Sequence, residues 1–369
     1  MTTTLFHKMA ALLFLITLSP DVRAQSADWQ KTWDDALAAA KKEGTVVIVG
    51  SPDPVMRKEI IPKFTARFGI PVEFIAGSSS TLAGRVRTER SSGIYSVDVF
   101  MSGDGTTINV LYPEKMIDPL KPLLILPEVV DGAKWKQGKP WFIDKEGQYI
   151  LALFSTVEAL IFINTDVVKR EEMRSATDLL NPQWKGKIVT DDPTAGGSGT
   201  GTAVHFYTQL GPEFLKKLYI DQKPVVSRDR RQTTDWLARG VYPICLTCRL
   251  DDVLVLQKEG FKLAGLYEFS DMLNRVKLSP LVLSVANRAP HPNAARVFVN
   301  WMASKEAGEI YGRALKMVPA RTDIDAASFM PPEVIPQPGV DYFDIYDYHF
   351  TTVINAESRR RMRDILRQQ

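Results

Sequence analysis

Short apolar runs rich in β-branched residues alternate with stretches of helical periodicity in the first third of the chain. The runs predict buried strands at residues 45–49, 71–75 and 96–101. The stretches between them predict helices at residues 28–44, 55–68 and 82–89. Asp28 is placed to cap the first of these helices. Strands that alternate with helices are typical of parallel βαβ units, so an α/β fold is expected.

The same alternation resumes in the second half of the chain. The predicted strands there are residues 159–164, 187–190, 225–226, 242–245 and 281–285. The predicted helices are residues 176–180, 202–210, 292–313 and 359–367. A chain of 369 residues is long enough for two domains of about 100–200 residues each. We therefore expect one α/β domain from each block of alternating elements.

The N-terminus has the pattern of a cleaved secretory signal peptide. Lys8 precedes a ten-residue apolar run, residues 9–18, and Val22 and Ala24 fit the small-x-small rule for cleavage before Gln25. A membrane span needs about 20 apolar residues, so the run is too short for an anchor. We expect residues 1–24 to be removed and the protein to be secreted to the periplasm.

Composition narrows the function classes. The chain holds 46 Lys and Arg against 43 Asp and Glu, a net charge of +3, which is too even for nucleic-acid binding by bulk charge. Two cysteines exclude a disulfide scaffold, and four histidines do not favour a multi-ligand metal cluster. Export also disfavours kinase and ATPase functions, because no ATP pool exists outside the cytoplasm.

Several segments resemble bacterial extracellular solute-binding proteins of ABC importers, and they occur in that family's order. These segments are residues 33–44, 97–100, 156–168, 237–244, 291–302 and 318–321. The resemblance covers nearly the whole mature chain and is strongest to the branch that includes ferric-ion, spermidine and thiamine binders.

The resemblance implies a type II periplasmic-binding-protein fold of two α/β lobes that close on a ligand. Lobe one would comprise residues 28–157 plus 278–318, and lobe two residues 158–277 plus 319–369. The aromatic and acidic segment 341–350 would pack the C-terminus onto lobe two. The family also implies a monomer that delivers a small molecule to an inner-membrane ABC permease, with no cofactor, metal or catalytic residue.

In lobe one, hydroxyl side chains follow predicted strands or precede a predicted helix. They are Ser51, Ser79, Ser80 and Ser102. Free backbone N–H groups and hydroxyls at a helix N-terminus can hold an anion, so we predict that these serines bind the ligand. The alternative is N-capping of the helix or an ordinary turn.

In lobe two, residues 192–202 form a glycine-rich loop before a predicted helix. Gly196 and Gly201 have the spacing of a phosphate-binding loop, but Thr202 and Ala203 stand where Lys and Ser or Thr should be. Nucleotide hydrolysis is therefore not expected, whereas oxyanion-holding backbone geometry is. This predicts ligand contacts from Thr194, Ser198 and Thr200. The alternative is a flexible linker.

Arg249 follows a predicted strand and is predicted to bind the ligand, because the arginine fork suits carboxylate and phosphate. Its alternative is a salt bridge with Asp251 or Asp252. We expect Arg230 and Arg231 at the surface, and Arg228 is left open between surface and cleft.

Cys245 and Cys248 have redox spacing in an oxidising compartment. In a continuous strand their separation would be about 10 Å, so a disulfide requires a turn at residues 246–247. The sequence leaves pairing open.

The leading hypothesis for the function is capture of a small oxyanion-bearing organic solute. Two alternatives stay open. The first is binding of a ferric ion or ferric chelate. Related iron binders carry an adjacent tyrosine pair after the strand corresponding to 242–245; here Thr247 and Cys248 take that place, and the chain has no Tyr-Tyr sequence. The second is an exported hydrolase, which needs a nucleophile beside a base. His205 is the histidine worth checking, since it follows the glycine-rich loop.

Overall fold

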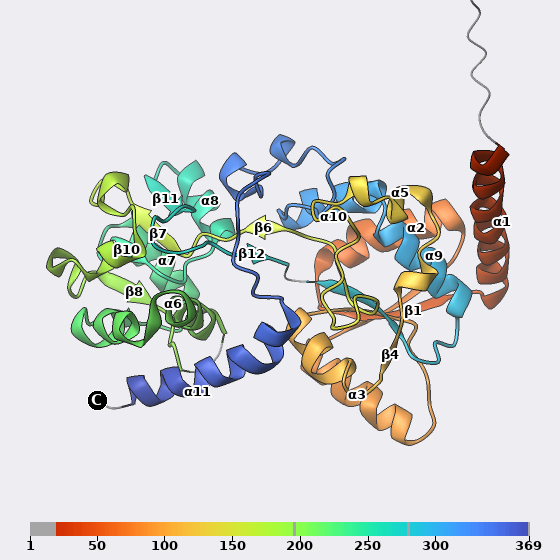
Figure 1. Cartoon of the computed structure of the whole chain (residues 1–369), viewed down its shortest axis with the longest axis horizontal. Helices are drawn as coiled ribbons and strands as arrows, with labels where there is room; N and C mark the ends of the chain where they lie inside the picture. The colour runs from red at the N-terminus through yellow and green to blue at the C-terminus, as the bar shows by residue number, and fades with distance from the viewer. Residues whose placement is uncertain (1–19, 195–196, 279–280, 368–369) are drawn as a thin grey trace, which may run out of the picture.

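The computed structural model describes residues 20–194, 197–278 and 281–367. Most of the expected signal peptide, as well as Gly196 of the glycine-rich loop, lies outside these residues. The chain forms two lobes that lie side by side, each built on its own β-sheet (Figure 1). In the part of the chain that is described, no helix is long and apolar enough to cross a membrane.

Lobe one is built on a six-stranded sheet with the order β2-β1-β3-β13-β4, and β5 pairs with β13. Its strands are β1 (Val46–Gly50), β2 (Val72–Ala76), β3 (Val99–Ser102), β4 (Ile117–Asp118), β5 (Leu151–Ala152) and β13 (Val282–Ala286). The strands β1, β2 and β3 are parallel, whereas β13 runs antiparallel to β3. Every residue of β1 and β13 is buried, which explains their unbroken apolar sequences.

Helices cover both faces of this sheet. They are α1 (Pro20–Glu43), α2 (Ile61–Phe68), α3 (Ser79–Ser91), α4 (Asp104–Thr106), α5 (Pro127–Val130), α9 (Pro292–Met302) and α10 (Lys305–Leu315). On one face Phe64, Phe298 and Trp301 form an aromatic core. On the other face Leu82 and Val86 of α3 pack against the sheet.

Lobe two is built on a five-stranded sheet with the order β11-β7-β10-β8-β9. Its strands are β7 (Ile161–Asn164), β8 (Ile188–Thr190), β9 (Val225–Val226), β10 (Ile244–Cys245) and β11 (Leu263–Leu266). Its helices are α6 (Gly197–Lys216), α7 (Arg230–Ala238) and α8 (Leu250–Lys258). Side chains of α6, such as Phe206, pack on one face, and Leu237 of α7 packs on the other.

Three passes of the chain connect the lobes. The short strands β6 (Thr156–Val157) and β12 (Val276–Lys277) pair antiparallel between the two sheets. The third pass runs beside β6, where the Val318 amide donates to the Thr156 hydroxyl at 2.9 Å. Antiparallel pairing across such a narrow connection leaves the lobes joined by few hydrogen bonds, which is the arrangement of a hinge.

The C-terminal segment, defined as residues 341–367, contacts both lobes. Its helix α11 (Asn355–Leu366) lies against α6, and Met362 is fully buried in the core of lobe two (Figure 1). Tyr346 and Tyr348 instead join the lobe-one core, where the Tyr348 ring lies 6.0 Å from the Tyr112 ring. The prediction that this segment packs on lobe two is therefore incomplete, because two of its aromatic side chains pack on lobe one.

Several predicted element boundaries are wrong. The first helix begins at Pro20, so residue 28 lies inside the helix and not at its N-cap position. The predicted helix 292–313 is two helices, because the Ser304 hydroxyl accepts from the Ala307 amide and begins α10 there. The predicted helix 202–210 instead starts at Gly197 and bends at Gly211, whose φ of 82° is left-handed.

Candidate functional site

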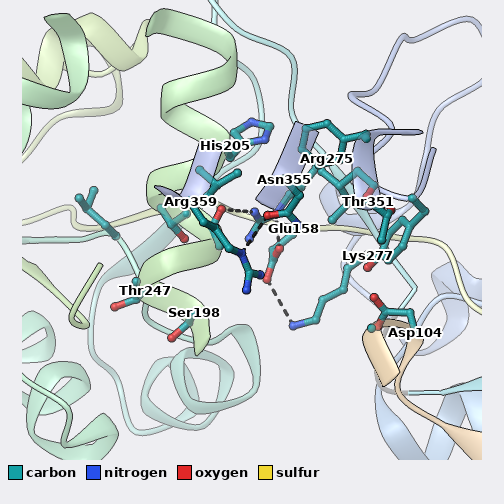
Figure 2. A pocket seen from close by; sticks show the side chains of 18 of the residues that line it. Asp104, Glu158, Ser198, His205, Thr247, Arg275, Lys277, Thr351, Asn355 and Arg359 are labelled. Carbon is teal, nitrogen blue, oxygen red and sulfur yellow. Dashed lines mark hydrogen bonds and ion pairs between the residues drawn. The ribbon is translucent and has the colours of Figure 1, made fainter. Parts of the chain in front are cut away.

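A cleft of about 890 Å³ lies between the two lobes (Figure 2). Lobe one contributes three lining residues, which are Asp104, Gly105 and Asn109. The C-terminal segment contributes eight, which are Ile345, Tyr346, Phe350, Thr351, Thr352, Asn355, Ala356 and Arg359. Lobe two and the hinge strands contribute the remainder, among them Glu158, Ser198, His205, Arg230, Thr247, Cys248, Arg249, Arg275 and Lys277.

Basic side chains outnumber acidic ones on the described cleft wall. The five basic residues are Arg230, Arg249, Arg275, Lys277 and Arg359, and the two acidic residues are Asp104 and Glu158. All five basic residues come from lobe two, the hinge or the C-terminal segment. This excess of cationic side chains makes the local electrostatic potential more positive, which would favour an anionic solute over a cationic one.

The hinge strands hold a three-residue ion network at the floor of the cleft. Arg275 Nε lies 2.6 Å from one Glu158 oxygen, and Lys277 Nζ lies 3.3 Å from the other (Figure 2). Arg275 Nη1 also donates to the Gly201 carbonyl at 3.0 Å. Burial alone would raise the pKa of Glu158, but the charges and hydrogen bonds of Arg275 and Lys277 lower it to about 2. Glu158 is therefore ionised at neutral pH.

Arg230 and Arg249 share an acidic pair at the start of α8. Arg230 contacts both Asp251 and Asp252, and Arg249 Nε lies 3.0 Å from Asp251. Both carboxylates lie in the first helical turn, where the helix dipole favours negative charge. Arg230 is exposed, as predicted, and its ion pairs with α8 also place it on the cleft wall. Arg249 meets both expectations, because it lines the cleft and forms the salt bridge.

Asp104 is the acidic group that lobe one presents to the cleft. It begins the short helix α4 and is half-buried. Burial raises the pKa of its carboxyl group, and the positive charge of Lys277 offsets this only in part. Figure 2 shows Asp104 on the same side of the cleft as the end of Lys277. A ligand group that donates hydrogen bonds would suit this carboxylate.

His205 is buried on the cleft wall and is neutral. Its Nε2 donates to the Leu273 carbonyl at 2.9 Å, and its Nδ1 has no hydrogen-bond partner in the described chain. Burial, together with the charge of Arg275, lowers the pKa of His205 to about 3. The ring is therefore held by a backbone carbonyl and does not change its protonation state near neutral pH.

The structure places two of the predicted ligand-binding residues, Ser198 and Arg249, on the cleft wall. The other six are absent from the described lining, and they are Ser51, Ser79, Ser80, Ser102, Thr194 and Thr200. Most of these hydroxyls already have partners within the fold. Ser79 Oγ accepts from the Gly103 amide at 3.0 Å, and Ser102 shares a hydrogen bond with Thr107 at 2.7 Å. Ser78 caps α3, which is the capping alternative for that serine run.

The N-terminus of α6 is closed by its own loop. The Thr200 hydroxyl donates to the Pro193 carbonyl at 2.8 Å, and the Ser198 hydroxyl donates to Asp191 at 2.9 Å. A Cβ at Gly199 would lie 2.5 Å from the Asp192 carbonyl oxygen, so loop carbonyls press directly against this turn. In the described part of the loop, residues 191–194 and 197–202, these contacts do not leave the open amide cradle that the glycine-rich sequence predicts. Thr194 likewise bonds to Asp192 rather than facing the cleft.

Cys245 and Cys248 form a disulfide. β10 ends at Cys245 and the chain bends at Leu246 and Thr247, which supplies the turn that the bridge requires. The bend also brings Thr247 and Cys248 to the cleft wall, where the Thr247 hydroxyl accepts from the Asp191 amide at 2.8 Å. The place expected for a tyrosine pair in iron binders is therefore a cleft position in this fold.

Sequence reasoning missed the residues that carry most of the cleft charge. Glu158 and Arg275 are 117 positions apart in sequence, so no local pattern joins them. A weak signal was available in Arg275–Val276–Lys277, where two basic residues flank an apolar one before a strand of the opposite lobe. Arg359 sits in a basic helix whose default interpretation is a solvated face.

Residues 45–314 match the sequence model of a family described as "Bacterial extracellular solute-binding protein". A curated relative, "Iron uptake protein A1" of Synechocystis, is 25% identical over 131 residues, which cover 36% of this chain and 33% of the relative. The chain thus aligns with about a third of that relative's length.

Two solved structures are similar over 87% of this chain. The first is the Trichodesmium protein IdiA (FutA) "in complex with iron and citrate ligands", with a TM-score of 0.64, 17% identity and 99% of that chain covered. The second is AfuA from Actinobacillus pleuropneumoniae with fructose-6-phosphate bound, with a TM-score of 0.55, 18% identity and 97% of that chain covered. These likenesses confirm the predicted two-lobed periplasmic-binding-protein fold.

Proposed function

Because the chain belongs to the bacterial extracellular solute-binding protein family, we propose that it is the periplasmic substrate-binding component of an ABC importer. Its ligand is a small organic solute that carries a carboxylate, phosphonate or phosphate group. The protein acts as a monomer, closes its two lobes on the solute and delivers it to an inner-membrane permease.

The observation that carries the proposal is the five-to-two excess of basic over acidic side chains on the described cleft wall. Glu158 pairs with both Arg275 and Lys277, so its one negative charge offsets one of their two positive charges. The other basic residues surround a space large enough for a metabolite of moderate size, since ligand sites commonly measure about 300–1,000 Å³. Cationic side chains in a partly enclosed cleft favour an anion over a neutral or cationic solute.

A ferric chelate is the second candidate, and the bound iron and citrate of the Trichodesmium protein favour considering it. The carboxylates of such a chelate would suit the basic wall. Direct coordination of a bare ferric ion is less well supported. In the described chain no three His, Cys, Asp or Glu residues cluster as metal ligands. Tyr346 is the one tyrosine of the described cleft wall; its hydroxyl accepts from the Leu278 amide, and burial raises its pKa.

The hydrolase alternative has less support than solute binding. It requires a base that can accept a proton from a nearby nucleophile. His205 Nε2 is committed to the Leu273 carbonyl, and its lowered pKa makes it a poor base at neutral pH. His291 pairs with Asp98 at 2.8 Å beside α9, away from the cleft lining.

Titration calorimetry with matched probes tests the proposal. Fructose 6-phosphate is compared with fructose, citrate with ferric citrate, and inorganic phosphate with spermidine. We expect binding by one or more of the anions and none by fructose or spermidine. Small-angle X-ray scattering should give a smaller radius of gyration for the anion-bound protein than for the free protein, because the lobes close. Spermidine binding tighter than every anion would overturn the ligand class. A tyrosine-to-iron charge-transfer band would establish direct iron coordination instead.

A further inference from the structure

Arg359 differs from the other four basic residues of the cleft. Arg275 and Lys277 pair with Glu158, while Arg230 and Arg249 pair with the acids of α8. The Arg359 guanidinium has no carboxylate partner among the residues that the structure describes. Its one hydrogen bond joins Nε to the Asn355 side-chain oxygen at 2.9 Å. The two terminal nitrogens of the fork are therefore left without a protein acceptor in the described chain.

The bond to Asn355 also orients the guanidinium. Asn355 lies one helical turn before Arg359 on α11, and both residues line the cleft. Using Nε for this contact leaves the two terminal NH₂ groups as a pair. Figure 2 shows Arg359 extending into the space between Thr247 and Ser198 on one side and Lys277 and Asp104 on the other. A paired set of N–H donors matches the two oxygens of a carboxylate, phosphonate or phosphate group.

The part of α11 that carries Arg359 is anchored in the core of lobe two. Met362, three residues further along α11, is fully buried there, and Ser358 is also buried. Phe350, just before α11, packs edge-on against Phe343. The backbone that carries Arg359 is thus fixed while its side chain stays exposed toward the cleft. A site built on a rigid helix can hold a ligand in one geometry.

The matched family region ends at residue 314, so α11 lies outside it. The segment nevertheless supplies eight of the described lining residues, against three from lobe one. This part of the wall is therefore set by sequence that the family model does not cover. We propose that Arg359 binds an oxyanion group of the solute through its terminal nitrogens, which makes the C-terminal segment a determinant of ligand specificity. This inference rests on the proposed function of anion capture.

The test uses four proteins and three anionic probes. Wild type, Arg359→Gln, Arg359→Lys and Arg360→Gln are titrated with citrate, inorganic phosphate and fructose 6-phosphate. Arg360 is the matched control, because it is the next residue on α11, is exposed and does not line the cleft. Melting temperatures are expected to agree among all four proteins, since neither arginine side chain is buried.

For the probe that binds wild type most tightly, we expect Arg359→Gln to weaken affinity by about 30-fold or more. Arg359→Lys keeps the charge but loses the fork, so its affinity should fall between those of wild type and the glutamine variant. Arg360→Gln should stay within about twofold of wild type. On adding the probe, amide exchange in residues 355–359 should slow in wild type and not in Arg359→Gln.

The outcomes separate this inference from the proposed function. If wild type binds no anion, the function fails and the inference with it. If wild type binds and Arg359→Gln binds equally well, the function stands and the role of Arg359 is overturned. Equal losses in Arg359→Gln and Arg360→Gln would also overturn it, because they would indicate a general charge effect of α11.

Discussion

The two walls of the cleft differ in both charge and origin. Lobe one presents Asp104, Gly105 and Asn109, which carry one negative charge and no positive one. The opposite wall, formed by lobe two, the hinge and the C-terminal segment, carries all five basic side chains. The two lobes therefore contribute unequally to the charge of the cleft. The fold provides the cleft, and in the proposed function one wall provides nearly all of the charge that would select the solute.

This asymmetry suggests an order of events. An anion would first meet the basic wall, which remains intact when the lobes are apart because its ion pairs lie within lobe two and the hinge. Lobe one would then close over the exposed face of the solute. Asp104 and Asn109 would meet hydrogen-bond donors on that face. Substitutions that weaken one wall at a time test whether the two walls differ in this way.

The largest effect on the unfolding free energy is expected for Arg275→Ala, next to the hinge strand β12. The substitution leaves the Glu158 carboxylate with Lys277 alone and frees the Gly201 carbonyl. Removing one partner of a buried ion pair costs about 3–5 kcal/mol of unfolding free energy. Lys277→Ala is the control, since its side chain is more exposed and should cost less. Urea denaturation measures both, and equal losses would show that Arg275 is not the principal partner of Glu158.

The disulfide should have the next largest effect. It fixes the bend that carries Thr247 and Cys248 on the basic wall, and lobe one has no counterpart because the chain contains no further cysteine. Closing so short a loop stabilises the fold by about 2 kcal/mol. Reduction with dithiothreitol should lower the unfolding free energy by about that amount and should also weaken anion affinity. The double variant Cys245→Ser, Cys248→Ser should behave like the reduced protein and show no response to dithiothreitol.

Arg249→Ala and Ser79→Ala compare the two walls directly. Arg249 lines the cleft but is half-exposed and shares Asp251, so its loss should cost about 1 kcal/mol of binding free energy, or about fivefold in affinity. Ser79 is absent from the described lining and accepts from the Gly103 amide, so its loss should reduce stability by about 1 kcal/mol and leave affinity unchanged. Calorimetry with the tightest anionic probe, beside thermal melts, distinguishes the two. A larger affinity loss for Ser79→Ala would reverse the comparison.

The smallest effect is expected for Asp104→Asn, which removes the lobe-one carboxylate, on the unfolding free energy of the ligand-free protein. Burial raises the pKa of Asp104 in the folded protein above its unfolded value of about 4. The folded state therefore binds more protons between these two pKa values, and wild type should lose stability as pH rises through that interval. Asp104→Asn removes this loss, so the variant should be the more stable protein at pH 7 and lose its advantage toward pH 4. Denaturation at both pH values measures the difference, and a constant difference would contradict the raised pKa.

Local sequence patterns predicted the elements of the fold well. The fully buried strands β1 and β13 have continuous apolar sequences, and the alternation with helices fixes the class. Errors came where one residue redirects the chain, as at Ser304, where a side-chain cap starts a new helix within an apolar periodic stretch. The boundaries predicted for the two lobes remain predictions.

The candidate site was harder to predict, because its residues meet only through tertiary structure. Glu158 and Arg275 come together across paired hinge strands, and Arg359 reaches the cleft only because α11 lies against α6. Conversely, serines and threonines near helix starts were assigned to the ligand, whereas the Ser79 hydroxyl accepts from the Gly103 amide and the Thr200 hydroxyl donates to the Pro193 carbonyl. Hydroxyls at helix N-termini have this local use first, so the pattern cannot distinguish a cap from a binding residue.

Native mass spectrometry of the protein, gently purified from the periplasm of the cells that express it, would identify the class of the bound solute. We expect one bound small molecule per monomer, with a mass that identifies a carboxylate, phosphonate or phosphate compound. That molecule should be released more readily from Arg359→Gln than from Arg360→Gln. A retained polyamine, thiamine or uncharged sugar would contradict the claim that the basic wall selects an anion.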